Sequence, residues 1–262
     1  FMIVFIRYDN GDSSMSMRVD TEKTGFWVAD VSWPVVEERL KQGAAALLFI
    51  AAASKEHGRH LPMGTDYFLA QWLGEALIDK LDVAIWPTLT YGYYPAFTEY
   101  PGSCSLPNSL FVALIKRVLD DIGRSGARQT FVVNTGISTV KGIDEAIDDN
   151  LRSSIQALHI FKREAYVTIA KELEKQKYGS HADELETSKM LVVSPEKVDI
   201  AMARPCDSKR FPPGRFSRND KNSPSYSPDG VYGDPTLATV EKGKRVLDVI
   251  VRDLTNAISA RA

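Results

Sequence analysis

Short apolar runs alternate with amphipathic stretches along most of this chain. The apolar runs, whose length is typical of strands buried on both faces, occupy residues 44–53, 83–89 and 128–134. Apolar residues recur at helical spacing over residues 67–81, 108–123 and 240–259. This alternation predicts an α/β fold with a mainly parallel sheet and helices on both of its faces.

Local signals mark the ends of some elements. Ser32 and Pro34 indicate a helix start, and Gly43 indicates where that helix ends. Asp66 is placed to cap the helix that begins after it. The remaining expected elements are a helix from about residue 142, a strand over 165–169 and a short helix over 185–194.

The pattern indicates a single domain over residues 1–262. Residues 1–31 are expected to form an N-terminal strand or extension, because the opening apolar stretch lacks the charged start and the cleavage site of a signal peptide. Residues 204–233 are rich in Pro, Ser, Gly and Arg without periodicity. They predict an irregular surface loop that serves as a lid or a subunit contact.

Composition narrows the classes of partner. The 262 residues carry a formal net charge of -2, so no basic surplus favours nucleic acid or an anionic membrane. No apolar run approaches the roughly 20 residues that cross a bilayer. The two cysteines, Cys104 and Cys206, lack the spacing of a thiolate zinc site. We therefore expect a cytoplasmic protein without a disulfide framework.

Three of the four histidines, His57, His60 and His181, lie in polar segments where chemistry can occur. Imidazoles and carboxylates are the usual ligands of zinc and manganese, and Glu56, Asp66 and Glu186 lie near these histidines in sequence. Spacing alone leaves a second interpretation open, in which a histidine of the pair 57 and 60 only hydrogen-bonds the backbone. The histidines therefore define a candidate site without fixing its ligand.

Residues 55–66 and three later segments resemble one enzyme family. Residues 55–66 read KEHGRHLPMGTD, which is similar to the signature E-x-H-G-x-H-L-P-x-x-T-D of the creatininase (creatinine amidohydrolase) family. The later segments that resemble family motifs are YPGSCSL at 100–106, HADELETSKML at 181–191 and GVYGDP at 230–235. This resemblance implies a three-layer α/β/α sandwich, a homo-oligomer, and two divalent metals that activate water against a cyclic amide.

The resemblance also implies which metal ligands this chain keeps. Of the family's five ligands, the histidine falls on His57 and the bridging aspartate on Asp66. The first glutamate falls on Lys55, and the histidine and glutamate of a later motif fall on Gly136 and Ser138. A further family histidine is replaced by Phe97.

These replacements remove two carboxylates and one imidazole and add an ammonium, so a two-metal site is not expected. We expect at most one divalent metal, Zn or Mn, held by His57 and Asp66. The Lys55 ammonium can occupy the vacated metal volume and pair with Asp66 or Glu56. A shift that lets Glu56 replace the lost glutamate would need a bulge, because neighbouring side chains point in different directions.

The leading hypothesis is a hydrolase that acts on a small cyclic amide or related carbonyl compound. His181 would serve as general acid or base and Glu186 would orient it. Lys55 would polarise the carbonyl or form an imine. The candidate substrate-binding residues are His60, Tyr91, Ser103 and Ser138.

A second hypothesis is an altered or inactive family member that binds a small metabolite or serves as an oligomeric binding protein. The loss of three of five ligands favours it. Without a functional role, Lys55 would be a solvated loop lysine and Glu186 a carboxylate that stabilises a helix start. The identity of the substrate lies beyond what these motifs specify.

Overall fold

A five-stranded parallel sheet forms the centre of the molecule. The computed structural model describes residues 24–147, 153–206, 211–212 and 216–261. Every neighbouring pair of strands in the sheet is parallel. In spatial order the strands are β1 (Phe26–Trp27), β3 (Val83–Leu89), β2 (Ala45–Ile50), β4 (Thr130–Asn134) and β5 (Ile155–His159).

The central strands are apolar because helices cover both faces of the sheet. Every residue of β2 and of β4 is buried. Strand β3 has the predicted bounds, and β2 and β4 lie within the predicted runs. The strands end in register, since Ile50 pairs with Leu89 and with Asn134, and Asn134 pairs with His159. The loops that follow these strands therefore begin side by side.

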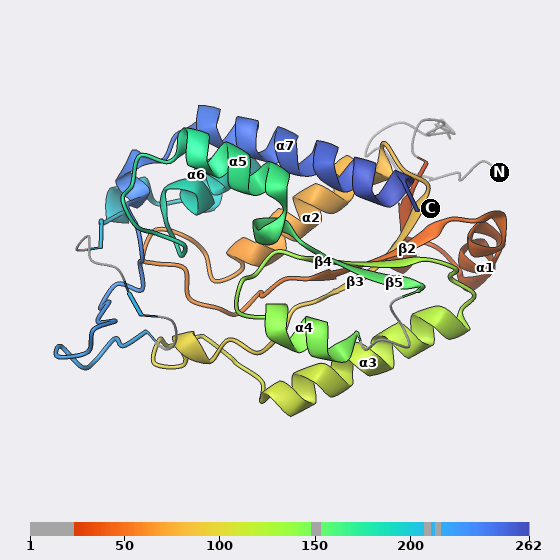
Figure 1. The fold of residues 1–262 in the computed structure, drawn as a ribbon, viewed down its shortest axis with the longest axis horizontal. Coiled ribbons are helices and arrows are strands. Elements are labelled where there is room, and N and C mark those ends of the chain that lie inside the picture. Colours follow the sequence, from red (N-terminus) through yellow and green to blue (C-terminus); the bar gives the residue numbers. More distant parts are fainter. Residues whose placement is uncertain (1–23, 148–152, 207–210, 213–215, 262) are drawn as a thin grey trace, which may run out of the picture.

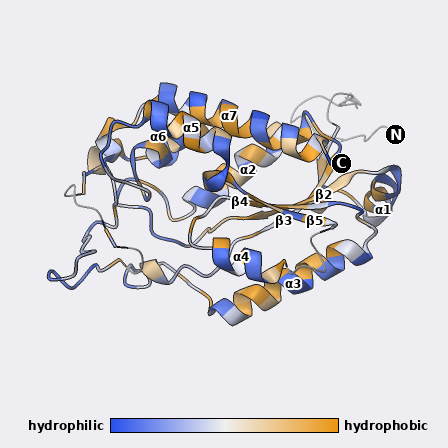
Figure 2. Ribbon diagram, in the orientation of Figure 1, coloured by the Kyte–Doolittle hydropathy of each residue, from blue (hydrophilic) through white to orange (hydrophobic). Residues whose placement is uncertain are grey.

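Helices form a layer on each side of the sheet, and Figure 1 shows this three-layer arrangement. One layer contains α2 (Thr65–Ile78), α5 (Glu164–Leu173), α6 (Glu184–Val193) and α7 (Val240–Ser259). The other layer contains α3 (Asn108–Arg124) and α4 (Val140–Ala146). Figure 2 shows hydrophobic and hydrophilic residues alternating along α3 and α7, as expected for helices with one buried face. The predicted α/β fold is confirmed.

Helix α1 (Trp33–Gln42) confirms the predicted end signals. Ser32 precedes it, Pro34 lies in its first turn, and Gly43 follows it with a φ of 110°. That left-handed conformation suits glycine, and the Gly43 amide hydrogen-bonds the carbonyl oxygens of Arg39 and Leu40. Leu40 is the residue of this helix that is buried, and it packs against Phe26.

The predicted strand over residues 165–169 is wrong, because these residues belong to α5. Ile169, Ala170 and Leu173 form the buried face of α5 and join the core that also contains α7. Burial of this helical face outweighs the weak strand preference of Val167 and Thr168. The chain instead forms its fifth strand at β5, an edge strand in which Gln156 and Ala157 are only half-buried.

The predicted cap at Asp66 is also wrong. Helix α2 begins at Thr65 after the N-cap residue Gly64, so Asp66 lies inside the first turn. Its carboxylate pairs instead with a lysine from the preceding loop. Asp66 therefore places a buried carboxylate at the carboxyl end of the sheet.

The two irregular segments are described in part. Strand β1 lies within the predicted N-terminal segment, whereas the rest of that prediction, over residues 1–23, lies outside the described residues. Within residues 204–233 the described part forms turns and isolated bridges, such as Ser217 with Tyr226. None of the helices among the described residues is long and apolar enough to cross a membrane.

Candidate active site

The predicted site residues meet at the carboxyl end of the sheet. Lys55, Glu56 and His57 follow β2, and Asp66 extends from the first turn of α2. His181 lies in the loop before α6, and Glu186 lies in the first turn of that helix. All six residues are buried, between 0 and 8% exposed, and together they form the cluster described below. The sheet thus brings together residues separated by up to about half of the sequence.

Lys55 and Asp66 form a buried ion pair, with Nζ 2.7 Å from Oδ2. Burial disfavours the ammonium, but the carboxylates of Asp66, Glu186 and Glu56 outweigh it and raise the pKa of Lys55. Burial likewise opposes the charge of Asp66, yet the Lys55 ammonium holds the pKa of Asp66 well below its usual range. Lys55 is therefore a charged, fixed cation, and the alternative that it is a solvated loop lysine is wrong.

Gly136 lies beside the same ion pair. A Cβ atom on Gly136 would lie 3.6 Å from Asp66 Oδ2 and no closer than 3.4 Å to any other neighbour. Position 136 therefore faces the Asp66 carboxylate and has room for a Cβ atom. The spatial arrangement agrees with the motif alignment, which assigns a family metal-binding histidine to Gly136.

His57 presents an unshared lone pair to the centre of the cluster. Its Nδ1 lies 2.9 Å from the carbonyl oxygen of Lys55, and only a protonated nitrogen can donate to that oxygen. In the neutral ring Nε2 is then the unprotonated nitrogen. Nε2 has no hydrogen-bond partner among the described residues and lies 3.5 Å from Asp66 Oδ1. In this neutral tautomer the Nε2 lone pair of His57 faces the Asp66 carboxylate.

His181 is held from two sides by carboxylates. Its Nε2 lies 3.0 Å from Glu56 Oε2, and its Nδ1 lies 3.8 Å from Glu186 Oε2. Glu56 also accepts a hydrogen bond from the amide of Gly58, which fixes its carboxylate. Glu186 Oε2 accepts a hydrogen bond of 2.6 Å from the Ala182 amide. Glu56 therefore orients His181 and does not replace the glutamate lost at position 55.

Aromatic side chains close the cluster. The centre of the Phe97 ring lies 4.3 Å from the centre of the His181 ring and 5.3 Å from Lys55 Nζ. The ring of Phe216, from the described part of residues 204–233, has its centre 5.6 Å from the ring centre of His181 and 5.3 Å from that of Phe97. These apolar rings exclude water and strengthen the electrostatic interactions beneath them.

The predicted substrate-binding residues occupy different environments. His60 is buried, and its Nε2 lies 2.8 Å from Thr187 Oγ1. Ser103 Oγ accepts a hydrogen bond of 3.0 Å from the Glu56 amide, so it helps to fix the backbone of Glu56. Tyr91 is 49% exposed on the loop after β3, and Ser138 is half-buried beyond β4. The structure thus places His60 and Ser103 next to site residues and Tyr91 at the surface.

One buried charge was missed by the sequence interpretation. Lys189 on α6 is 2% exposed, and its Nζ has no hydrogen-bond acceptor among the described residues. The nitrogen lies 4.7 Å from the Phe161 ring centre and 5.6 Å from that of Tyr166. A lysine three residues after Glu186 on a helix is the signal that could have indicated it, because such residues share a face.

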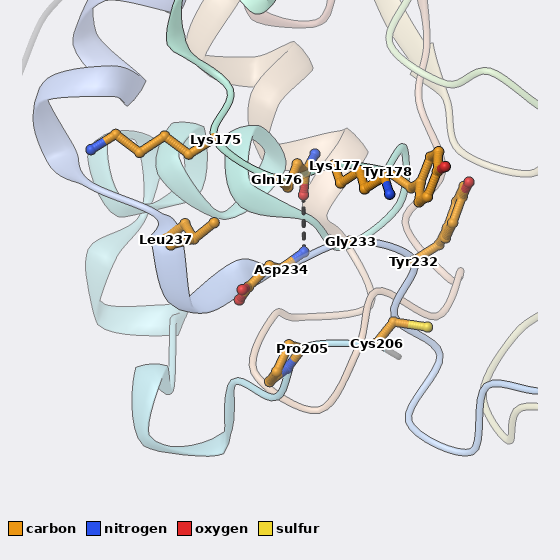
Figure 3. Close-up of a pocket in the computed structure, with 10 residues that line it drawn as sticks. All are labelled: Lys175, Gln176, Lys177, Tyr178, Pro205, Cys206, Tyr232, Gly233, Asp234 and Leu237. Carbon is orange, nitrogen blue, oxygen red and sulfur yellow. Dashed lines mark hydrogen bonds between the residues drawn. The ribbon is translucent and has the colours of Figure 1, made fainter. Parts of the chain in front are cut away.

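A separate cavity of about 360 Å³ is lined by residues outside the cluster. Figure 3 shows these lining residues. Its lining includes Gln176, whose Oε1 accepts a hydrogen bond from the Asp234 amide. The backbone of Tyr232, another lining residue, exchanges hydrogen bonds with the backbone of His181. None of the candidate catalytic side chains lines this cavity, so it is distinct from the site.

Comparison with known proteins places the chain among hydrolases. A creatinine amidohydrolase from Pseudomonas putida is 25% identical over 252 residues, covering 88% of this chain and 95% of the relative. A 3-dehydro-scyllo-inosose hydrolase from Thermotoga maritima is 27% identical over 271 residues, covering 90% of this chain and 86% of the relative. Both relatives therefore align along nearly the whole chain.

The fold and the family model agree with these relatives. A solved creatinine amidohydrolase (creatininase) superposes with a TM-score of 0.75 at 23% identity, covering 92% of this chain and 98% of that chain. The family model described as creatinine amidohydrolase matches residues 29–258. This match spans most of the chain, including every residue of the candidate site. The chain therefore belongs to the creatininase family.

Proposed function

We propose that this creatininase-family hydrolase cleaves a carbon–nitrogen bond in a small cyclic amide, or a related carbonyl compound, with at most one divalent metal. One observation carries the proposal. A buried cluster holds the free lone pairs of His57 Nε2 and His181 Nδ1 near the fixed ammonium of Lys55. Such a cluster combines groups that activate water with a positive charge that stabilises a developing oxyanion.

The family's two-metal donor set does not fit this chain. Lys55 Nζ lies 2.7 Å from Asp66 Oδ2, so an ammonium takes the oxygen that would otherwise face a metal. Positions 136 and 138 carry glycine and serine, which offer no imidazole or carboxylate. The unpartnered, buried Nε2 of His57 does fit a single zinc or manganese ion. Among similar solved creatininases, one is named as a manganese form and another as a Zn–Zn type.

Each residue then has a definable role. A bound divalent metal would supply an activated water and polarise the carbonyl group. Lys55 offers a positive charge to the carbonyl oxygen as negative charge develops there. Its raised pKa favours this role over imine formation, which needs a neutral amine. His181, oriented by Glu56 and flanked by Glu186, keeps a lone pair for proton transfer or for metal ligation.

The closure of the site supports a small substrate. Phe97 and Phe216 pack against His181, and this leaves the cluster buried. The Pseudomonas putida relative is named for creatinine and the Thermotoga maritima relative for 3-dehydro-scyllo-inosose. We therefore propose a ring-shaped carbonyl compound as the substrate class of this chain.

Turnover of a panel of cyclic amides and lactones, in the presence of zinc or manganese, tests the proposal. We expect one panel member to be hydrolysed, with kcat reduced at least 100-fold by Lys55→Met and by His181→Asn. Arg59→Ala, at an exposed ion pair with Asp229, is the matched control and should retain activity. Undiminished turnover in both cluster variants would reject the roles proposed for Lys55 and His181.

A binding-only family member is the second candidate, and a specific observation favours it. Lys55 neutralises Asp66 internally, and aromatic rings cover the cluster, which is what a site that has lost catalysis would retain. Calorimetric titration with the same panel distinguishes the two functions. Saturable binding of a compound that is never hydrolysed would support the binding protein.

A further inference from the structure

We infer that His57, His181 and Glu186 form a mononuclear metal site, displaced from the family's two-metal position. The inferred donor set shares only His57 with the ligand set that the family motifs imply. The inference concerns metal binding alone, so it stands or falls separately from the proposed hydrolysis.

The three donor atoms already converge. One atom from each of His57, His181 and Glu186 lies within 4.8 Å of the other two, and all three residues are buried. A zinc ion binds nitrogen and oxygen donors at about 2.0–2.2 Å, so donors on a tetrahedral ion are about 3.5 Å apart. His181 Nδ1 and Glu186 Oε2, at 3.8 Å, are close to that spacing. His181 and Glu186 therefore have almost the separation that a zinc ion needs, and an atom of His57 lies within 4.8 Å of both.

Both histidines have the tautomer that metal ligation requires. The outer nitrogen of His57 donates to the Lys55 carbonyl oxygen, and that of His181 donates to the Glu56 carboxylate. Each ring is thereby left with its unprotonated nitrogen facing the cluster. Metal-bound histidines almost always show this pattern, in which the second ring nitrogen is anchored by a carbonyl or a carboxylate. Nothing else among the described residues hydrogen-bonds His57 Nε2.

Charge balance also points to a divalent cation. Glu56, Asp66 and Glu186 contribute three carboxylates to the buried cluster, whereas Lys55 contributes one ammonium. Asp183 and Lys189, which also interact electrostatically with Glu186, add one charge of each sign. With neutral histidines the cluster keeps an excess of two negative charges. A single divalent ion would neutralise that excess.

Lys55 explains why the site is displaced. Its ammonium occupies one side of the Asp66 carboxylate, where Gly136 also faces, and repels a metal from that side. His57 Nε2 lies 3.5 Å from Asp66 Oδ1, and the centre of the His57 ring lies 5.0 Å from that of the His181 ring. The His57 imidazole can therefore bind a metal that lies on the side of His181.

Zinc binding to the 262-residue chain, first stripped with a chelator, tests the inference by calorimetry and elemental analysis. We expect one zinc per chain, with the affinity lowered at least 10-fold by His181→Asn and by Glu186→Gln. Glu186→Gln keeps an oxygen for the Ala182 amide and should preserve the fold. His159→Asn removes a histidine that contacts Asp144 and Asn134 and is not one of the three inferred ligands, so it should leave the affinity unchanged.

Three results would overturn the site. These are absence of zinc binding by the unmodified chain, full affinity in both cluster variants, or a larger loss in Asp66→Asn than in Glu186→Gln. The last result would put the metal between His57 and Asp66. Cobalt substitution adds a spectroscopic check, because the visible bands of a bound cobalt ion should change in Glu186→Gln and not in His159→Asn. A chain that binds one zinc but hydrolyses no panel compound would reject the proposed function and retain the site.

Discussion

Lys55 Nζ lies 2.7 Å from Asp66 Oδ2, and both side chains are almost completely removed from solvent. Two opposite charges at that distance in a dry environment depend on each other, because either one alone would be an uncompensated buried charge. The ion pair joins the loop after β2 to the first turn of α2. It is therefore both a structural connection and the fixed positive charge of the site.

Lys55→Met should lower the free energy of unfolding by about 3–5 kcal/mol, since it leaves the Asp66 carboxylate buried without its partner. Urea unfolding at neutral pH measures the change. Lys41→Met, which breaks an exposed pair with Glu37, is the control and should change stability by less than about 0.5 kcal/mol. A loss below about 1 kcal/mol in Lys55→Met would show that Asp66 is compensated by another group.

Combining Lys55→Glu, Gly136→His and Ser138→Glu should restore a second metal. The three changes return the donors that the family motifs imply, and a Cβ at position 136 would face Asp66 Oδ2 from 3.6 Å. We expect elemental analysis to find one more zinc per chain than in the unmodified protein. Lys55→Glu alone is the comparison, because it brings two carboxylates together without the remaining ligands. Equal metal content in the triple variant and the unmodified chain would contradict the motif alignment.

Lys189→Met should stabilise the protein by about 1–3 kcal/mol, because a buried amine without an acceptor is replaced by an apolar chain of similar length. Burial lowers the pKa of Lys189, although Glu186 and Asp183 favour its charge. Urea unfolding of the variant gives the change, with the exposed Lys171→Met as control. Destabilisation would mean that attraction to Glu186 and Asp183 outweighs the cost of burial.

Stability should decrease on acidification partly because of His60. Burial lowers the pKa of His60 from 6.5 to about 4, against the opposite effect of Glu186 and Glu56. Between these two values the unfolded chain binds a proton that the folded chain excludes, so stability is retained above pH 6.5 and lost towards pH 4. The full contribution is about 3 kcal/mol. The unfolding free energy of His60→Gln should depend less on pH in this window, and an identical slope would remove His60 as the cause.

Gly230→Ala should disturb Glu56 as well as the backbone. Gly230 has a φ of 75°, and a Cβ there would lie 1.9 Å from Glu56 Oε1. Gly43→Ala separates the two effects, because Gly43 has a φ of 110° but no atom within 4 Å of its would-be Cβ. We expect about 1–2 kcal/mol of destabilisation at Gly43 and more at Gly230. Nitrogen NMR of His181 should also change only in Gly230→Ala, since Glu56 holds that ring.

Much of the fold could be predicted because burial imposes a clear period on the sequence. Strand β3 and helix α7 have the predicted bounds, since one is apolar along most of its length and the other has one apolar face. The strand predicted over residues 165–169 is wrong because the true strand, β5, has a weak apolar period. Strand β5 lies at the sheet edge, where half-buried Gln156 and Ala157 weaken its pattern. Local composition does not show which of two neighbouring segments will reach that edge.

The candidate site was predicted in its members but not in its pairings. The motifs led to the alternative that Lys55 pairs with Asp66, and the ion pair of 2.7 Å selects it over Glu56. Glu56 instead contacts His181, 125 positions away, and no spacing in the sequence encodes that contact. Such pairings depend on how the loops after β2 and before α6 cross at the sheet edge. They become visible only when the backbone is folded.

The ammonium of Lys55 is a cation that the polypeptide carries with it. It cannot be chelated, diluted away or exchanged for a competing ion, as a bound metal can. The Asp66 carboxylate is consequently neutralised as soon as the chain folds, whatever the supply of trace elements around it. The link between the loop after β2 and the first turn of α2 therefore forms without a metal, and chelators should leave the Lys55–Asp66 pair intact.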